Sequence, residues 1–375
     1  MMGGDRREIQ ELKDIANARL ELVLGRLGVR ERPRGGRGTI LICDPMTADN
    51  DPSLAIWTRM AGGLSWKRYG GDAQGDIIDL VSYLKGWWHL PRRGSGEAIA
   101  WLRDVLGIRR LNPRQAAELA QQSRARRLEA EKNQAELAAR RQAAARAIWF
   151  DAEPKILDTP AETYLREARG IDLRADPFIG PRGGSLVPSA IRFAPLLKHV
   201  DQDTRTETLW PAIVTACVDY SDGHFGQIRA VHRTYLAPDG RSKAPVAKAK
   251  MVLGAFTGLV MPLWRGDANL PVREAIEAGL LQTLVLTEGL EDGLSAIVGN
   301  PAPRIWAAIS LDNIGNVPLP ACIDGVIVHQ QNDEKRQAAL AFERALGKVR
   351  ARGVPVALAP AFAGKDLNDT LRGAA

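Results

Sequence analysis

Two short polar segments, each directly behind an apolar stretch, constrain the fold of this chain more than any other feature. The segment Glu288–Asp292 follows the apolar run Thr283–Leu286, and the segment Gln331–Asp333 follows the apolar run Gly325–Val328. Short apolar runs bounded by polar residues predict buried strands. Carboxylates at the carboxyl ends of neighbouring parallel strands face one crevice, and such a crevice can hold Mg²⁺ against phosphates. The two segments therefore predict an acidic site at one edge of a parallel sheet.

The spacing of these segments resembles the Toprim domain, the catalytic module shared by bacterial primases, type IA and type II topoisomerases and some nucleases. The first motif of that family is a Glu-Gly behind a strand with an Asp shortly after, and Glu288, Gly289 and Asp292 match it. The second motif is Asp-x-Asp, for which the segment Gln331–Asp333 reads Gln-Asn-Asp. A further predicted strand, Pro303–Ala308, separates the two motifs as the family requires.

A third segment strengthens the resemblance. Gly364–Asp369 reads Gly-Lys-Asp-Leu-Asn-Asp, which is similar to the Lys-Asp-x-Asn-Asp signature that closes the Toprim domains of phage- and plasmid-type primases. The resemblance covers roughly residues 280–375. It implies a C-terminal α/β Toprim domain with a parallel sheet over residues 276–375.

The resemblance also implies roles for the polar residues of this site. The catalytic residues it implies are Glu288, Asp292 and Asp333. The ligands it implies for Mg²⁺ or Mn²⁺ are Glu288, Gln331, Asp333, Asp366 and Asp369. Because a Gln amide oxygen can ligate Mg²⁺ but brings no charge, Gln331 predicts weakened metal affinity. Taken one at a time, a Glu-Gly also fits a turn, and an Asn-Asp also fits a helix N-cap.

The N-terminal part resembles the zinc-ribbon domain at the front of bacterial primases. Its Pro-Ser, aromatic-Gly and Gly-Asp pairs are present within residues 39–90, after an amphipathic helix predicted over residues 6–28. Only Cys43 remains of the ligands, and Arg68 and Gly71 stand where the later cysteine pair is expected. A structural zinc site needs four Cys or His ligands, so no zinc is expected. We predict a degenerate zinc-ribbon-like domain over residues 1–108; an unrelated small α+β domain is the alternative.

A basic helical connector is predicted over residues 109–148. The stretch 113–148 opens with Pro113, which suits a first helical turn, and is rich in Ala, Gln, Glu and Arg, all good helix formers. Its apolar content is mostly alanine. Such a helix is either a solvated connector or a binder of backbone phosphates.

Residues 149–275 resemble the N-terminal half of a phage-type primase core, a mixed α+β subdomain. The matching pieces include the segments Thr159–Leu165, His232–Leu236 and Lys248–Gly254. The stretch 229–250 is strongly basic, and Arg suits bidentate phosphate contacts while Lys supplies a point charge. The residues predicted to bind nucleotide or nucleic acid are Arg229, His232, Arg233, Lys243, Lys248, Lys250 and Lys365. A solvated basic loop is the alternative interpretation of this stretch.

Composition limits the partner and the compartment. The 375 residues carry a formal net charge of +7, which favours a polyanionic partner. The three cysteines lie far apart and predict no disulfide framework. No signal peptide and no apolar run long enough to span a bilayer is found, so we expect a cytoplasmic protein without a membrane partner.

The function that the resemblance implies is that of a DNA primase. Such a protein binds single-stranded DNA and makes short primers from nucleoside triphosphates by Mg²⁺-dependent nucleotidyl transfer, here for a phage, a plasmid or an integrated element. No Walker A motif is present, so a replicative helicase is expected only as a separate partner. Two alternatives remain open: a weakly active or inactive homologue that binds nucleic acid as an accessory factor in replication or defence, and a Toprim nuclease.

Overall fold

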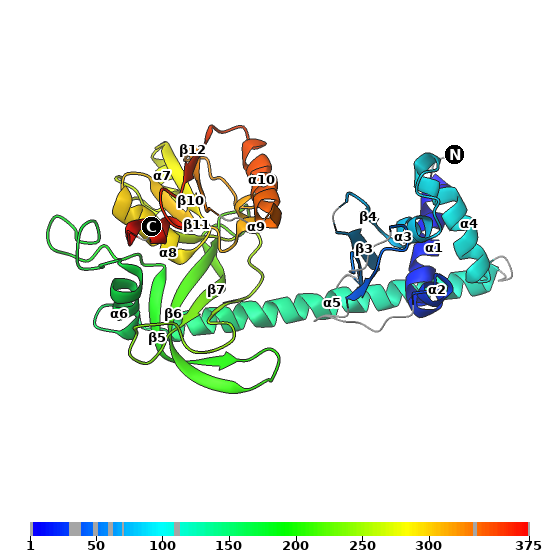
Figure 1. Ribbon diagram of the computed structural model, residues 1–375, viewed down its shortest axis with the longest axis horizontal. Coiled ribbons are helices and arrows are strands. Elements are labelled where there is room, and N and C mark those ends of the chain that lie inside the picture. Colours follow the sequence, from blue (N-terminus) through cyan, green and yellow to red (C-terminus); the bar gives the residue numbers. More distant parts are fainter. Residues whose placement is uncertain are drawn as a thin grey trace. The chain divides into compact units, whose positions relative to one another are not determined.

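The computed structural model describes residues 3–29, 39–47, 52–58, 63–69, 71–108, 113–332 and 336–373. The chain divides into two compact units, Met1–Leu137 and Ala138–Ala375. Both units mix helices and sheets, as the sequence predicts for an α+β protein (Figure 1). Within the described ranges, no helix combines the length and the apolar character needed to cross a membrane.

The first unit contains a four-stranded antiparallel sheet. The strands follow chain order: β1 (Ile40–Ile42), β2 (Leu54–Thr58), β3 (Leu64–Arg68) and β4 (Gln74–Gly75). Its helices are α1 (Gly3–Ala18), α2 (Leu20–Arg26), α3 (Ile77–Leu84) and α4 (Ser95–Val105), with the 3₁₀ turn η1 (Pro91–Gly94) between the last two. The single amphipathic helix expected over residues 6–28 is therefore two helices, because Arg19 leaves the helical region with φ −116° and ψ 37°.

Packing and one ion pair hold the region that resembles a zinc ribbon. Trp66 contacts the rings of Tyr83 and Trp88 at centroid distances of 4.8 Å and 5.7 Å. Arg68, at a position where the resemblance expects a zinc ligand, pairs with the buried carboxylate of Asp44, Nε to Oδ2 at 2.7 Å. The Tyr83 hydroxyl donates to the same oxygen at 2.6 Å. These contacts tie the segment beside Cys43 to β3 and α3.

The predicted basic helix is present as α5 (Pro113–Asp151), which is 39 residues long. It continues beyond residue 148 because its last turns are no longer solvated. Ala145 and Trp149 are buried in an apolar cluster with Val214 and Val231 of the second unit. Helix α5 therefore ends as a packed element of that unit.

The second unit begins with a four-stranded antiparallel sheet. Its strands, again in chain order, are β5 (Ile191–Val200), β6 (Glu207–Asp219), β7 (Gln227–Tyr235) and β8 (Lys250–Leu253). Strands β6 and β7 pair antiparallel and form a hairpin whose turn includes residues 221–223. A short helix, α6 (Pro160–Thr163), continues into a π turn, η3 (Tyr164–Ala168), and Thr159 caps it by accepting from the Ala161 N–H at 3.2 Å.

A five-stranded sheet forms the rest of the second unit. Its strands are β9 (Met261–Arg265), β10 (Gln282–Thr287), β11 (Arg304–Ala307), β12 (Ile323–Gln330) and β13 (Val356–Pro360). They are ordered β13-β12-β10-β11-β9, and all pairs are parallel except β11 with β9. The helices beside it are α7 (Val272–Glu277), α8 (Leu290–Gly299), α9 (Leu311–Ile314), α10 (Arg336–Arg350) and α11 (Leu367–Leu371). Both β9 and α7 begin before residue 276, so the sheet recruits chain from ahead of the expected domain start.

Helix α8 lies where the two sheets of the second unit share a core (Figure 1). Leu290 and Leu294 of α8 are buried in one cluster with Ile213 of β6 and Ile305 of β11. The approach is close at Gly293, where a Cβ would lie 2.3 Å from Leu263 Cδ1. A larger residue at this position would therefore require Leu263 to shift.

Candidate functional site

The two predicted motifs meet at one edge of the parallel sheet. Leu286 of β10 pairs with Val328 of β12, so the two strands end side by side. Glu288 leaves β10 just before α8, and Gln331 leaves β12 at the same edge. Both residues line a small hollow beside α10. The carboxyl ends of parallel strands thus form the crevice that the sequence predicts.

Asp292, in the first turn of α8, is the most tightly held carboxylate of this crevice. It is 4% exposed. Its Oδ2 accepts from Gln331 Nε2 at 2.9 Å, and its Oδ1 accepts from the Asn368 backbone N–H at 3.3 Å. Burial, followed by repulsion from Asp366, raises the pKa of Asp292 to about 6. Asp366 is therefore close enough to disfavour the charge of Asp292.

Gln331 occupies the place of the first Asp of the Asp-x-Asp motif, and its contact explains how the exchange is accommodated. A carboxylate here would repel Asp292 across the hydrogen-bond distance. The amide instead donates a hydrogen bond, which lowers the pKa of Asp292 and partly offsets burial. The Gln331 hydrogen bond therefore favours the ionised form of Asp292.

The loop after β13 is clamped to the end of β12 by Asn332. Its Nδ2 donates to the carbonyls of Ala361 and Gly364, each at 3.0 Å, and its N–H donates to the Lys365 carbonyl at 2.8 Å. Between these anchors Phe362 is 94% exposed. The clamp thus presents an aromatic ring to solvent from a fixed loop next to the crevice.

The two aspartates of the closing segment differ in what they do. Asp366 caps α11 by accepting from the Asp369 N–H at 2.9 Å, and its charge acts on Asp292. Asp369 turns back, and its Oδ2 accepts from the Lys365 N–H at 3.1 Å. Asp366 thus lies at the crevice, whereas Asp369 stabilises the loop. Lys365 itself is exposed at the same loop.

An ion pair between an exposed lysine and a buried glutamate joins the crevice helix to the antiparallel sheet. Lys250 Nζ of β8 lies 2.7 Å from Glu291 Oε2 of α8, and the Tyr164 hydroxyl donates to Glu291 Oε1 at 3.2 Å. Burial opposes the charge of Glu291, but the charge and hydrogen bond of Lys250 overcome it and lower the pKa of Glu291 to about 2. Glu291 is therefore ionised at any ordinary pH.

Other basic groups surround this pair. Arg169 Nε donates to the Tyr164 hydroxyl at 2.7 Å. Lys243 is half-buried, and burial together with the charge of Lys250 lowers its pKa. The charge of Asp366 acts on both Arg169 and Lys243. Cations from three separate segments thus converge beside the acidic crevice.

His232 belongs to the same face but carries no charge at neutral pH. It is 7% exposed, and burial lowers its pKa to about 4 against the opposing effect of Glu291. Its Nδ1 has no hydrogen-bond partner among the described residues. His232 is therefore a neutral core side chain of the crevice wall.

Strand alternation separates the rest of the predicted basic set from the crevice. Lys250 pairs with Thr234 and Met251 pairs with Arg233, so Lys250 and Arg233 point to opposite faces of the sheet. Arg233 is 9% exposed, and its Nη1 donates to the Tyr235 hydroxyl at 3.0 Å. The predicted basic stretch is thus not one surface.

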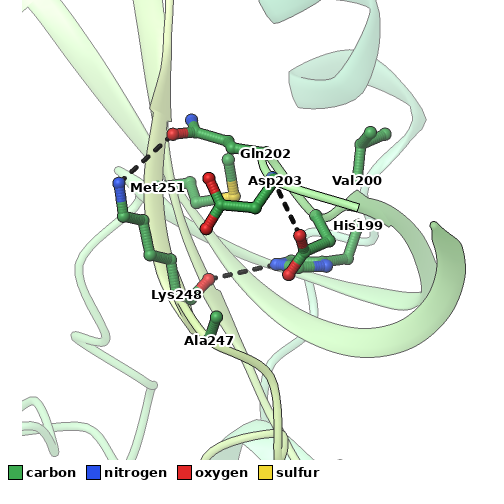
Figure 2. A pocket seen from close by; sticks show the side chains of 8 residues that line it. His199, Val200, Gln202, Asp203, Ala247, Lys248 and Met251 are labelled. Atoms are coloured by element: carbon green, nitrogen blue, oxygen red, sulfur yellow. Dashed lines mark hydrogen bonds between the residues drawn. The ribbon is translucent and has the colours of Figure 1, made fainter. Parts of the chain in front are cut away.

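The remaining two members lie at the ends of the antiparallel sheet. Arg229 pairs with Asp219, Nη1 to Oδ2 at 3.0 Å. Lys248 is exposed at the rim of a shallow hollow next to β5, where its Nζ donates to Gln202 Oε1 at 3.2 Å and its carbonyl contacts His199 Nε2 at 3.1 Å (Figure 2). Both side chains therefore interact with neighbouring residues of their own sheet and not with the crevice.

Comparison with known families agrees with this geometry. Residues 283–375 match the family described as Toprim domain. The C-terminal part of this chain is a Toprim domain. The residues ahead of it, 139–263, match a family described as a domain of unknown function (DUF7146).

A comparison with solved structures adds a further similarity. The chain is similar to the crystal structure of the primase fragment of the bacteriophage T7 primase-helicase protein, at 15% identity and a TM-score of 0.29. The match covers 49% of this chain and 63% of that chain. A comparison with curated proteins gave no match.

The oxygen donors of the Toprim domain suit a hard divalent cation. Asp292 and Asp366 repel one another beside the Gln331 amide, and a cation between such groups would relieve the repulsion. Asp333, a predicted catalytic residue and ligand, lies outside the described residues. Within the described part of the chain, no three Asp, Glu, His or Cys side chains gather into a metal cluster by themselves.

Three residues of this site, Glu291, Tyr164 and Arg169, are missing from the set that the sequence predicts. Glu291 had an available signal. Neighbours in a helix point about 100° apart, so only one of Glu291 and Asp292 can face the crevice, and the other needs a cation elsewhere. Tyr164 and Arg169 had no such signal, because their partner lies more than a hundred residues away along the chain.

Proposed function

We propose that this protein binds single-stranded DNA and joins nucleoside triphosphates into short primers by metal-dependent nucleotidyl transfer. One observation carries the proposal: the acidic crevice of the Toprim domain lies directly beside Arg169 and Lys243, on which the charge of Asp366 acts. Acidic oxygens beside basic side chains are the arrangement that phosphoryl transfer needs, because the metal ion and the cationic side chains must both reach the phosphates.

Each group has a task in this proposal. A divalent cation, when bound, neutralises the triphosphate and polarises the reacting phosphorus. Asp292, Asp366 and the Gln331 oxygen would hold it, together with Glu288 and Asp333. Lys243 and Arg169 would bind the triphosphate from the facing side. Glu288 would accept the proton of the attacking hydroxyl.

Further features support the primase class over other Toprim enzymes. We propose that the first unit is a zinc ribbon that has lost its metal, in which the Asp44–Arg68 pair and the Trp66 cluster take over the cross-linking role. The segment 149–275 would serve as the primase core, and a separate replicative helicase of the same phage, plasmid or integrated element would be the partner.

The test is primer synthesis on single-stranded DNA with labelled nucleoside triphosphates and Mg²⁺. We expect short products from the native protein and none from the Glu288→Gln variant. Glu343→Gln is the matched control, because Glu343 is exposed on α10 and does not line the hollow that Glu288 and Gln331 share. Products from Glu288→Gln at the native rate would show that the chemistry lies elsewhere.

Gln331 favours a second candidate, a nucleic-acid-binding protein without catalysis. Its amide donates a hydrogen bond to the Asp292 carboxylate at 2.9 Å, so Asp292 has a stabilising partner other than a cation. A Gln331→Asp variant separates the candidates. An enzyme should gain activity or need less Mg²⁺, whereas a binding protein should stay inactive in both forms. Cleavage of the DNA in the same reactions would instead indicate a Toprim nuclease.

A further inference from the structure

A second hollow of the same unit lies at the other end of the parallel strands. It is a cavity of about 310 Å³ between the β6–β7 hairpin and the β9–α7 segment. Arg304, which opens β11, lines it and pairs in register with Arg265, the last residue of β9. The acidic crevice is at the carboxyl ends of β10 and β12, so this cavity faces away from it. Its volume is within the range of small-ligand sites.

Aromatic rings form the walls of this cavity, and their neighbours hold them in place. The rings are those of Trp149, Tyr220, Phe225 and Trp264. Tyr220 is stacked on the buried Trp306, with ring centroids 4.8 Å apart and an interplanar angle of 7°. The indole N–H of Trp264 donates to the Pro301 carbonyl at 2.7 Å. Rings fixed in this way offer a preformed surface for a planar, aromatic ligand.

Two arginines of the same cavity have unused hydrogen-bond donors. Arg265 and Arg273 are exposed, and neither side chain makes a hydrogen bond or an ion pair with any residue that the structure describes. Arg273 only rests over the Phe225 ring, 5.7 Å from its centroid. By contrast, Arg304 is buried and bound to Gln282 and the Leu270 carbonyl.

No carboxylate is among the described residues that line the cavity. Its positive charge is therefore uncompensated. Guanidinium groups present several N–H donors in a fixed plane and bind phosphate oxygens by paired hydrogen bonds. A ligand that suits the cavity is thus planar and aromatic at one end and anionic at the other.

We propose that this cavity binds one nucleotide unit, with its base against the aromatic walls and its phosphate on Arg265 and Arg273. Base stacking on aromatic side chains tolerates any base, and charge-assisted hydrogen bonds fix the phosphate. The same chemistry is offered by a free nucleotide and by a nucleotide of a single strand. The site is independent of nucleotidyl transfer, since none of the crevice carboxylates takes part in it.

Isothermal titration calorimetry of the full chain in EDTA tests this site. EDTA removes divalent cations, so it suppresses binding of triphosphate in the acidic crevice. One arm titrates ATP and adenosine, and the other titrates an oligothymidylate of about ten nucleotides. Primer synthesis is not read out, so failure of this proposal and failure of the proposed enzymatic function are distinguishable.

We expect one of the two phosphate-bearing probes to bind. Affinity should fall about tenfold or more in the Arg265→Gln/Arg273→Gln double variant, because each contact to a charged group is worth about a factor of ten. ATP, if it is the ligand, should also bind more tightly than adenosine. Arg344→Gln, an exposed arginine of α10, is the control and should leave the affinity unchanged.

Phe225→Leu is a second test variant, because it removes one aromatic ring of the cavity without changing its charge. We expect it to weaken binding severalfold. Binding of ATP alone would identify a site for free nucleotide, and binding of the oligonucleotide alone would identify a site on the path of a strand. The proposal is overturned if neither probe binds, or if the double variant binds both as the native protein does.

Discussion

Replacing Lys250 by Met isolates the energetic role of the ion pair beside the crevice. Lys250 is 38% exposed at its side chain, but its partner Glu291 is only 7% exposed. The variant leaves that carboxylate buried with the Tyr164 hydroxyl as its remaining side-chain donor. Breaking a buried ion pair from one side is far more harmful than replacing both partners, because an uncompensated charge stays in the interior.

The pKa of Glu291 sets the magnitude. Its pKa falls from 4.5 to about 2 on folding, and each pKa unit corresponds to about 1.4 kcal/mol. The favourable surroundings of the ionised form therefore contribute about 3 kcal/mol to the free energy of unfolding at neutral pH. Since Lys250 is partly exposed, we expect Lys250→Met to lose about 2–3 kcal/mol, at or just below the roughly 3–5 kcal/mol typical of fully buried pairs.

Urea unfolding at two pH values measures this loss. A lowered folded-state pKa contributes stability that is present above pH 4.5 and is lost as the pH falls toward 2. In the variant, Lys250 no longer opposes the effect of burial, so the pKa of Glu291 is higher than in the native protein and less stability is lost on acidification. The difference in stability should therefore be large at neutral pH and shrink on acidification.

Two further variants make the reasoning refutable. Lys250→Met/Glu291→Gln should recover most of the lost stability, because no buried charge remains, and Lys248→Met should be neutral because Lys248 is exposed. A loss below about 0.5 kcal/mol in Lys250→Met, or a double variant no more stable than the single one, would contradict the assigned role of the pair.

Four other outcomes can be checked on the same protein. Gly293→Ala should lower the free energy of unfolding by about 2 kcal/mol in urea titrations, because its Cβ would lie 2.3 Å from Leu263 Cδ1; a neutral effect would contradict the close approach. His232→Gln should flatten the stability profile between pH 6.5 and about 4, since the unfolded chain takes up a proton there that burial denies the folded chain, and a profile parallel to that of the native protein would argue against a neutral buried His232. Phe362→Ala should weaken single-stranded DNA or nucleotide binding by about tenfold at unchanged stability if its exposed ring stacks on a base, whereas unchanged affinity in a filter-binding assay would remove it from the site. Binding of single-stranded DNA should weaken with salt, with a log–log slope of about 0.7 per neutralised phosphate, and a flat response would exclude a backbone-phosphate interface.

Local sequence predicted the elements of the Toprim domain well. The apolar runs before Glu288 and before Gln331 form β10 and β12, and the strands are parallel and adjacent as expected. These features are predictable because a buried strand needs an uninterrupted apolar run, and because parallel strands bring their carboxyl ends to one edge.

The length of a helix was less predictable, because packing decides where it stops. The segment 6–28 has one continuous apolar stripe, yet the chain breaks at Arg19 and forms α1 and α2. Both helices bury side chains in one cluster with Trp66 and Ile77. The bend lets both helices bury their apolar side chains in this shared core, and the apolar stripe alone does not predict it.

By itself, the sequence determined that acidic side chains would gather at a sheet edge beside a basic stretch. Only the tertiary structure decided which of them interact. Strand alternation places Lys250 beside Glu291 and turns Arg233 to the other face. Gln331 donates a hydrogen bond to Asp292. The sequence showed only that Gln replaces the expected Asp at this position, and it did not reveal this contact. The physical reason is that composition and periodicity specify which residues are buried, whereas the partner of a buried charge depends on which distant segment packs against it.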